Sequence, residues 1–132
     1  MAIDKKDITR LIALAEAARN NAYAPYSGFC VGAALLSCDD GVFTGANVEN
    51  VSYGATICAE RVAFDKAVSE GSHEFKAIAI VGGEGLAYPC GICRQVMAEF
   101  CGEDFLVIVA QKPNEYELLS LGQLLPKAFK LK

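Results

Sequence analysis

Cys58-Ala59-Glu60, followed about 30 residues later by Pro89-Cys90-Gly91-Ile92-Cys93, supplies three thiols and one carboxylate for a single site. Thiolates are good ligands for zinc, and a structural zinc usually closes its tetrahedral shell with four protein ligands. A catalytic zinc instead keeps one position for water. We therefore expect Cys58, Cys90 and Cys93 to hold one zinc ion per chain in a catalytic site, with Glu60 beside it.

The spacing of these residues predicts that both stretches lie at the starts of helices. Cys58 and Glu60 are two residues apart and would point to nearly opposite sides of a regular helix, so they converge only at its end. Cys90 and Cys93 are three apart and share one face. Two helix amino ends would then direct free N–H groups and positive dipole ends at the metal. Together with Arg61, they would offset the excess negative charge of three thiolates.

Hydrophobic periodicity outward from these two helices predicts the remaining elements. A turn signal at Asp39-Asp40-Gly41 separates two apolar runs, which indicates a β-hairpin. The expected elements are a helix over 4–21, strands over 29–37 and 42–48, a helix over 58–70, a strand over 77–81, a helix over 90–101, a strand over 105–109, and a short helical pattern through Leu118, Leu121 and Leu124. This order predicts an α/β fold: a three-layer α/β/α sandwich with a mixed sheet, in one catalytic domain spanning residues 1–132.

The composition limits the partners and the compartment of the chain. It has 12 basic and 16 acidic residues, a formal net charge of -4 and no basic run, so nucleic acid is not an expected partner. Neither a signal peptide nor a membrane span is expected, because the run from Leu11 to Ala18 is short and carries Glu16. Six cysteines without a secretion signal indicate reduced thiols and a cytoplasmic location. The 53% hydrophobic content suggests apolar surface hidden between subunits.

A structural zinc is one alternative, and it would need a fourth cysteine. Cys101 lies about 12 Å beyond Cys93 along a continuous helix, which places it too far away. Cys30 and Cys38 are separated by roughly 26 Å of strand, so at most one of them reaches the metal.

A redox function is a second alternative, because paired cysteines at a helix start favour a thiolate. The sequence Cys90-Gly91-Ile92-Cys93 has this thioredoxin-like spacing. Such a pair would leave Cys58 and Glu60 without a role. The two stretches taken together therefore favour metal chemistry over redox chemistry.

Five blocks of sequence, which together cover most of the chain, carry a further pattern. They are Tyr26-Ser27-Gly28-Phe29-Cys30-Val31-Gly32-Ala33-Ala34-Leu35, Gly45-Ala46-Asn47-Val48-Glu49-Asn50-Val51-Ser52-Tyr53-Gly54, Cys58-Ala59-Glu60-Arg61, Pro89-Cys90-Gly91-Ile92-Cys93-Arg94-Gln95-Val96 and Leu124-Leu125-Pro126-Lys127-Ala128-Phe129. This pattern resembles the small zinc-dependent cytidine deaminases of the homotetrameric three-cysteine type. Tyr88 departs from it, because the residue before the Pro-Cys pair is commonly serine in that family.

The resemblance implies a hydrolase of pyrimidine salvage that converts cytidine and deoxycytidine to uridine and deoxyuridine with release of ammonia. The zinc lowers the pKa of a water molecule, and Glu60 is the catalytic residue that moves the proton. In zinc deaminases generally, for nucleoside and polynucleotide substrates alike, this glutamate is not itself a zinc ligand. The acidic chain offers no path for a polynucleotide strand.

The resemblance also implies roles for residues around the metal. The backbone near Ala59 contacts the base, Phe29 packs against it, and Asn47 with Glu49 holds the ribose hydroxyls. Arg61, and less clearly Gln95, would support the cysteine sulfurs through hydrogen bonds. Neighbouring chains of a homotetramer would complete each pocket with two further residues, which are Tyr53 and Phe129.

Simpler interpretations of the substrate residues stay open at this point. Asn47 and Glu49 also fit a polar strand end, and Phe29 also fits a core position in an apolar run. A deaminase acting on a blasticidin-type antibiotic is a rival within the fold, although Glu49 argues against it. A zinc-binding scaffold protein is a rival from another class, and it would not need Glu60.

Overall fold

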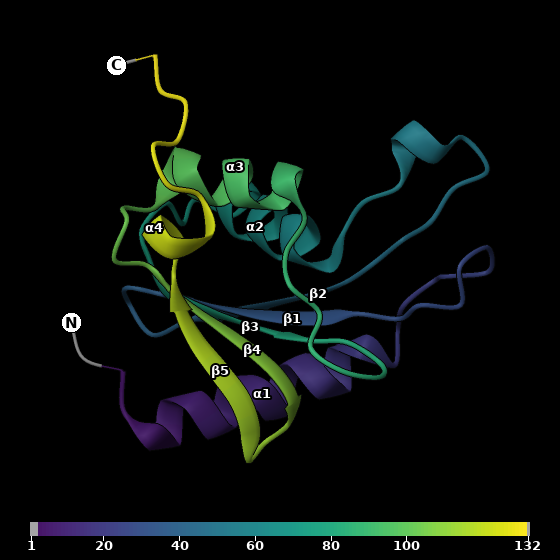
Figure 1. The fold of residues 1–132 in the computed structure, drawn as a ribbon, viewed down its shortest axis with the longest axis horizontal. Coiled ribbons are helices and arrows are strands. Elements are labelled where there is room, and N and C mark those ends of the chain that lie inside the picture. The colour runs from purple at the N-terminus through teal and green to yellow at the C-terminus, as the bar shows by residue number, and fades with distance from the viewer. Residues whose placement is uncertain (1–2, 132) are drawn as a thin grey trace.

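A five-stranded sheet in the order β2-β1-β3-β4-β5 lies at the centre of the structure, a computed structural model that describes residues 3–131 (Figure 1). β3 and β4 run parallel, and the other neighbouring strands are antiparallel. The strands are β1 (Gly32–Ser37), β2 (Val42–Ala46), β3 (Phe75–Val81), β4 (Leu106–Lys112) and β5 (Glu115–Ser120). The predicted mixed sheet is confirmed.

Helices cover both faces of this sheet. They are α1 (Lys5–Arg19), α2 (Ala59–Ser69), α3 (Gly91–Phe100) and α4 (Leu121–Leu124), with a short 3-10 turn η1 (Tyr53–Ala55). Figure 1 shows α1 on one side of the sheet, and α2 and α3 on the other. The three-layer α/β/α arrangement predicted from the sequence is therefore confirmed. Within residues 3–131, none of the helices combines the length and apolar character needed to cross a bilayer.

The alternation of side chains along the central strand produces two separate cores. Ala77, Ala79 and Val81 of β3 pack in the cluster that contains the buried face of α1. Ile78 and Ile80 point to the opposite face and pack in the cluster of α2 and α3. Because both faces are covered, β3 is apolar from Ala77 to Val81 and does not alternate there between apolar and polar residues. The second core carries the elements that position the site.

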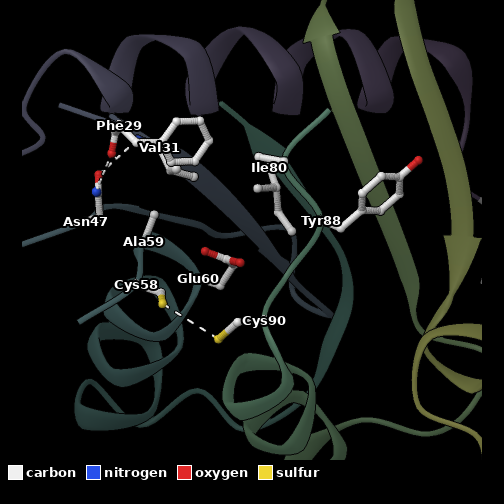
Figure 2. Close-up of a pocket in the computed structure, with 10 residues that line it drawn as sticks. Phe29, Val31, Asn47, Cys58, Ala59, Glu60, Ile80, Tyr88 and Cys90 are labelled. Carbon is white, nitrogen blue, oxygen red and sulfur yellow. Dashed lines mark hydrogen bonds between the residues drawn. The ribbon is translucent and has the colours of Figure 1, made fainter. Parts of the chain in front are cut away.

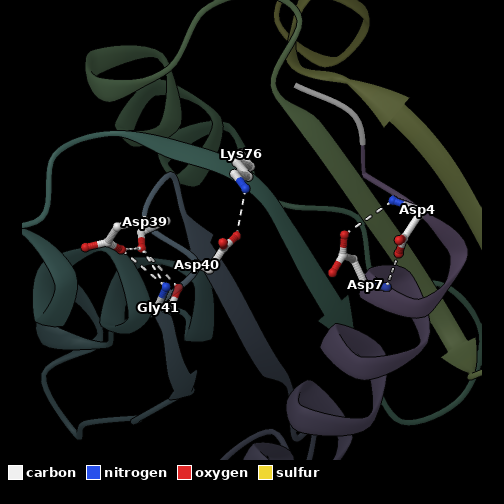
Figure 3. A network of polar contacts seen from close by, with 7 residues as sticks. Asp4, Asp7, Asp39, Asp40, Gly41 and Lys76 are labelled. Carbon is white, nitrogen blue, oxygen red and sulfur yellow. Dashed lines mark hydrogen bonds and ion pairs between the residues drawn. The ribbon is translucent and has the colours of Figure 1, made fainter.

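Polar contacts fix the start of α1 and the turn between β1 and β2 (Figure 3). Asp7 N donates to Asp4 Oδ1 at 2.8 Å, and Asp4 N donates to Asp7 Oδ2 at 3.3 Å, which closes a capping arrangement. In the turn, Asp40 has a positive φ of 71° and pairs with Lys76 Nζ of β3 at 2.7 Å. These contacts fix the backbone where α1 begins and where the chain reverses direction between β1 and β2.

The expected helical pattern through Leu118 is wrong. Leu118 lies on β5, where it pairs with Ile108 of β4, and the helix that follows covers only Leu121–Leu124. Two residues, Pro113 and Asn114, separate β4 from β5, and both residue types are common in turns. The spacing of three leucines masked this signal in the sequence.

The first hairpin is shorter than predicted at both outer ends. β1 begins at Gly32, so Phe29 precedes the strand and is free to face a cavity. β2 ends at Ala46, and Val48 makes only isolated bridges to Tyr23 and Ile57. The segments before β1 and after β2 therefore lie side by side as irregular backbone.

The close approach of α2 to β2 generates a prediction about Gly45. A methyl group at this position would overlap the carbonyl oxygen of Ala59 and come within 2.7 Å of the backbone nitrogen of Ala63. Since both atoms are backbone, Gly45→Ala must shift the first turn of α2. We expect the free energy of unfolding to fall by about 1–3 kcal/mol, measured by urea denaturation.

The matched control is Gly54→Ala, because nothing lies within 4 Å of a Cβ built there. Its free energy of unfolding should stay within about 0.5 kcal/mol of the parent value. Equal losses in the two variants would contradict the importance of the approach at Gly45.

Candidate functional site

Three cysteine sulfurs meet between the amino ends of α2 and α3. Cys58 is the N-cap residue of α2, Cys90 is the N-cap residue of α3, and Cys93 lies in the first turn of α3. Their Sγ atoms all lie within 4.8 Å of one another. The Cys58 and Cys90 sulfurs are 3.8 Å apart (Figure 2). The Cys90 and Cys93 sulfurs are 3.5 Å apart. The structure thus brings together the three residues that the sequence singled out.

The sulfur spacing fits one zinc ion. With Zn–S bonds of about 2.3 Å in a tetrahedral arrangement, two ligand sulfurs lie roughly 3.8 Å apart. The other cysteines of the chain, Cys30, Cys38 and Cys101, do not belong to the group found among residues 3–131. The cluster therefore supplies three of four tetrahedral positions, which is the donor set of a catalytic zinc site.

The backbone explains why these sulfurs converge. Cys58 has φ -72° and ψ 153°, and Cys90 has φ -70° and ψ 170°, so each is extended immediately before its helix begins. The N–H of Cys93 points to the Cys90 sulfur at 3.5 Å. Free N–H groups and the positive dipole ends of both helices thus face the cluster.

Positive charge at the cluster also comes from a side chain. Arg61 Nη2 donates to Cys58 Sγ at 3.4 Å. A hydrogen bond from the Cys93 thiol, followed by the contact with Arg61, lowers the pKa of Cys58 to about 5. The pKa of Cys93 is raised, because its thiol donates to Cys58 and because it is buried. Both contacts favour the thiolate form of Cys58, which is the form that binds a metal.

Glu60 is the carboxylate of the site. It lies in the first turn of α2 and is 5% exposed, and Figure 2 shows it next to Cys58 and Cys90. Burial raises its pKa to about 7, with a further contribution from the Cys58 charge. A carboxyl group with this pKa can both accept and return a proton near neutral pH.

A cavity of about 200 Å³ opens above the cysteines and Glu60. It is lined by Phe29, Val31, Asn47, Cys58, Ala59, Glu60, Ile80, Ala87, Tyr88 and Cys90. A cavity of about 150 Å³ is enough to hold a benzene ring, so this one can take a single heterocyclic ring. Apolar walls with a carboxyl group and sulfurs at one end are suited to a flat ring that reacts at one edge.

Phe29 and Asn47, both predicted from the sequence to contact the substrate, line this cavity. Phe29 is 46% exposed, so it is not a core residue. Asn47 is buried; its Nδ2 donates to the Phe29 carbonyl at 2.8 Å, and its Oδ1 accepts from Val31 N at 2.9 Å. Asn47 therefore holds the segment before β1 in place, a structural role that the sequence did not reveal.

Glu49 is placed outside the lining of the cavity. Its Oε1 accepts from the backbone N–H groups of Tyr26 and Ser27 at 2.9 and 3.1 Å, and the Ser27 hydroxyl donates to its Oε2. The Ser27 hydroxyl is the main reason why the pKa of Glu49 is lowered. The carboxylate orders the turn that leads into Phe29.

Tyr53 and Phe129 lie away from the cavity of their own chain. They are 79% and 70% exposed. Tyr53 makes an edge contact with Tyr26, with ring centroids 6.4 Å apart. Gln95 was expected to support a cysteine sulfur. In the structure its Nε2 instead donates to the Phe129 carbonyl of the carboxyl-terminal tail at 3.2 Å.

Several residues of the site were not predicted. Ile80 and Ala87 line the cavity, but an apolar residue at the end of a strand or in a loop gives no signal of this in one sequence. Arg94 lies in one of the matching sequence blocks, but no role was predicted for it. Its Nε donates to the Pro89 carbonyl at 2.7 Å and its Nη1 to the Leu124 carbonyl at 2.8 Å. It thus joins the loop before Cys90 to the last helix.

Relatives of known name share this sequence over nearly its full length. A cytidine deaminase of Sporosarcina psychrophila is 49% identical over 124 residues, which are 93% of this chain and 91% of that protein. A probable cytidine deaminase of Dictyostelium discoideum is 42% identical over 129 residues, covering 96% of this chain and 86% of that protein.

Solved structures agree with these relatives. The crystal structure of cytidine deaminase from Burkholderia pseudomallei has a TM-score of 0.86 and 50% identity, covering 91% of this chain and 97% of that one. The crystal structure of cytidine deaminase from Mycobacterium tuberculosis has a TM-score of 0.83 and 43% identity, covering 98% and 100%. The family model for the cytidine and deoxycytidylate deaminase zinc-binding region matches residues 5–109. This chain belongs to the family of cytidine and deoxycytidylate deaminases that carry this zinc-binding region.

Proposed function

We propose that this chain is a cytidine deaminase that hydrolyses cytidine and deoxycytidine to uridine and deoxyuridine with release of ammonia. The observation that carries the proposal is a buried carboxyl group, Glu60, beside three converging cysteine sulfurs at the end of a cavity sized for one ring. The names of relatives that match more than nine-tenths of the chain support it. The reaction breaks the bond between the ring and its exocyclic amine and forms a bond to a water oxygen.

Cys58, Cys90 and Cys93 would hold zinc, which when bound supplies Lewis acidity that lowers the pKa of water. Glu60 accepts a proton from the attacking water and returns it to the ring nitrogen and the departing amine. Burial raises the pKa of Glu60 above the ordinary carboxyl value, which favours the first transfer, uptake of the proton. The apolar walls exclude bulk water from the reacting edge.

The substrate would be held by residues along the segments that flank the first hairpin. Phe29 packs on the base, and the backbone at Ala59 contacts its polar edge. Asn47 and Glu49 bind the ribose hydroxyls: a carboxylate only accepts hydrogen bonds, whereas the amide also donates them. Asn47 has a second amide hydrogen besides the one given to Phe29, which supports this role. Gln95 would act on the site through the tail that it holds.

The chain would work as a single catalytic domain in a homotetramer, in pyrimidine salvage in the cytoplasm. The exposed rings of Tyr53 and Phe129 support the tetramer, because neither lines the cavity of its own chain while both are large and apolar. Neighbouring chains would bring these rings to each pocket. A cysteine cluster that must stay reduced to bind metal supports the reducing compartment.

The function is tested with Glu60→Gln, which keeps the shape of the side chain and removes its ability to take a proton. Purified protein is mixed with cytidine, and the loss of its ultraviolet absorbance band is followed alongside zinc per chain. We expect one zinc in both proteins and a turnover lower by about 10²- to 10⁴-fold in the variant. No loss of the band with the parent protein, or equal turnover in the two, would refute the proposal.

A second prediction concerns Arg61, whose guanidinium contacts the Cys58 sulfur. Arg61→Ala should weaken zinc retention by about 10- to 100-fold, because less positive charge offsets the thiolates. Competition with a chelator followed by zinc analysis measures this directly. Arg10→Ala, which removes the same charge from the exposed side of α1, should retain zinc like the parent protein. Equal zinc loss in the two variants would argue against the contact.

A third prediction tests whether chains share pockets. Glu60→Gln chains lack the carboxylate, and Phe129→Ala chains lack the ring that a neighbour would supply. Refolding the two variants together should give kcat/KM on cytidine above that of either variant alone, because some pockets regain both groups. Activity equal to the average of separate preparations would mean that pockets are not shared.

A further inference from the structure

Tyr88 lies at the border of the cavity, and its hydroxyl forms a hydrogen bond with a residue of β5. The hydroxyl donates to Glu117 Oε1 at 2.5 Å. Figure 2 shows the ring running from the cavity toward β5, with the hydroxyl pointing away from Glu60. The ring is nevertheless 48% exposed, so packing does little to hold it there.

The sheet register places Glu117 on the same side as the cavity. Ile80, which lines the cavity, pairs with Val109 of β4, and Val109 pairs with Glu117 of β5. Residues paired across neighbouring strands share one face of a sheet. The side chain of Tyr88 therefore spans from the cavity to β5 on the side of the sheet where α2 and α3 pack.

The cavity offers the Tyr88 ring a competing position. Its walls include the apolar side chains of Phe29, Val31 and Ile80, and its volume of about 200 Å³ exceeds what an aromatic ring needs. A half-exposed ring gains free energy by moving out of water into such a space. The hydrogen bond to Glu117 opposes this movement.

The backbone on both sides of Tyr88 is fixed by other contacts. The Arg19 guanidinium donates to the Gly82 carbonyl at the start of the loop, and Arg94 Nε donates to the Pro89 carbonyl at its end. Pro89 itself is fully buried. Loss of the contact with Glu117 would thus release the Tyr88 side chain while the loop stays in place.

We propose that Glu117 is a positioning residue that holds the Tyr88 ring outside the cavity, so that the cavity stays open to the pyrimidine base. The proposal rests on the proposed function for the identity of the base. A ring that enters the cavity occupies the space of the substrate. Binding then requires the open fraction of molecules, and the apparent affinity falls by that fraction. Saturating substrate selects the open state, so the maximal rate is preserved.

The kinetic test uses zinc-loaded full-length protein with cytidine. Glu117→Ala removes the acceptor and should raise KM by about three- to tenfold with kcat unchanged. Tyr88→Phe keeps the ring and loses the donor, so its KM should rise equally, and combining it with Glu117→Ala should add nothing. Glu117→Gln keeps an acceptor oxygen and should restore most of the affinity.

The decisive variant is Tyr88→Ala combined with Glu117→Ala. If the ring obstructs the cavity, its removal should return KM toward the parent value, whereas a merely structural contact would leave KM raised or raise it further. Glu115→Ala, which removes the same charge from an exposed position on β5, is the matched control and should leave KM unchanged. A raised KM that persists in the double variant overturns the proposal.

A crystal structure of the Glu117→Ala protein without substrate gives a readout that does not depend on turnover. We expect the Tyr88 ring inside the cavity. A ring that keeps its parent position overturns the proposal, whatever the kinetics. If the parent protein fails to deaminate cytidine, the proposed function is refuted, and the ring position in this structure still decides the role of Glu117.

Discussion

The need to hold three sulfurs within 4.8 Å of one another as metal ligands is the constraint on which the rest of the structure depends. Once all three have lost their protons to bind zinc, they repel one another, so positive charge has to face them. Two helix amino ends and the Arg61 guanidinium supply it. Those helix ends must in turn approach the sheet closely, which explains why α2 rests on β2 at a residue without a side chain. The site and the packing of one layer of the fold thus have a common cause.

Much of the fold and the metal cluster could be predicted because the signals are local. Cys58 and Glu60 are compatible only with a helix start, and the structure has α2 beginning directly after Cys58. The layers follow from periodic apolar positions, such as those on the buried face of α1. β5 was missed because three leucines at helical spacing outweighed a two-residue turn at Pro113 and Asn114. Spacing in the sequence does not distinguish these two possibilities when the pairing partner is unknown.

The walls of the cavity could not be predicted in the same way, because they depend on distant segments. Phe29 was undecided between core and site until the structure placed it before β1 rather than within it. Asn47 was selected for polarity toward a ligand, yet its amide also ties down the Phe29 and Val31 backbone. A single sequence records only that an asparagine is present, and it does not show the two backbone groups to which the side chain is bonded. The contact between Tyr88 and Glu117 joins residues 29 positions apart and has no sequence signal at all.

Because the metal-binding sulfurs are far apart along the chain, a bound metal also affects the stability of the fold. Cys58 and Cys90 enclose about 30 residues, which include α2 and β3. An ion bound by both closes that segment into a loop, as a disulfide would, and removes conformations from the unfolded chain. A cross-link over a loop of this length is worth about 3 to 4 kcal/mol by loop-closure entropy. The zinc ion of the reaction is therefore also a cross-link between two helices. A chain without it loses conformational stability as well as catalytic activity.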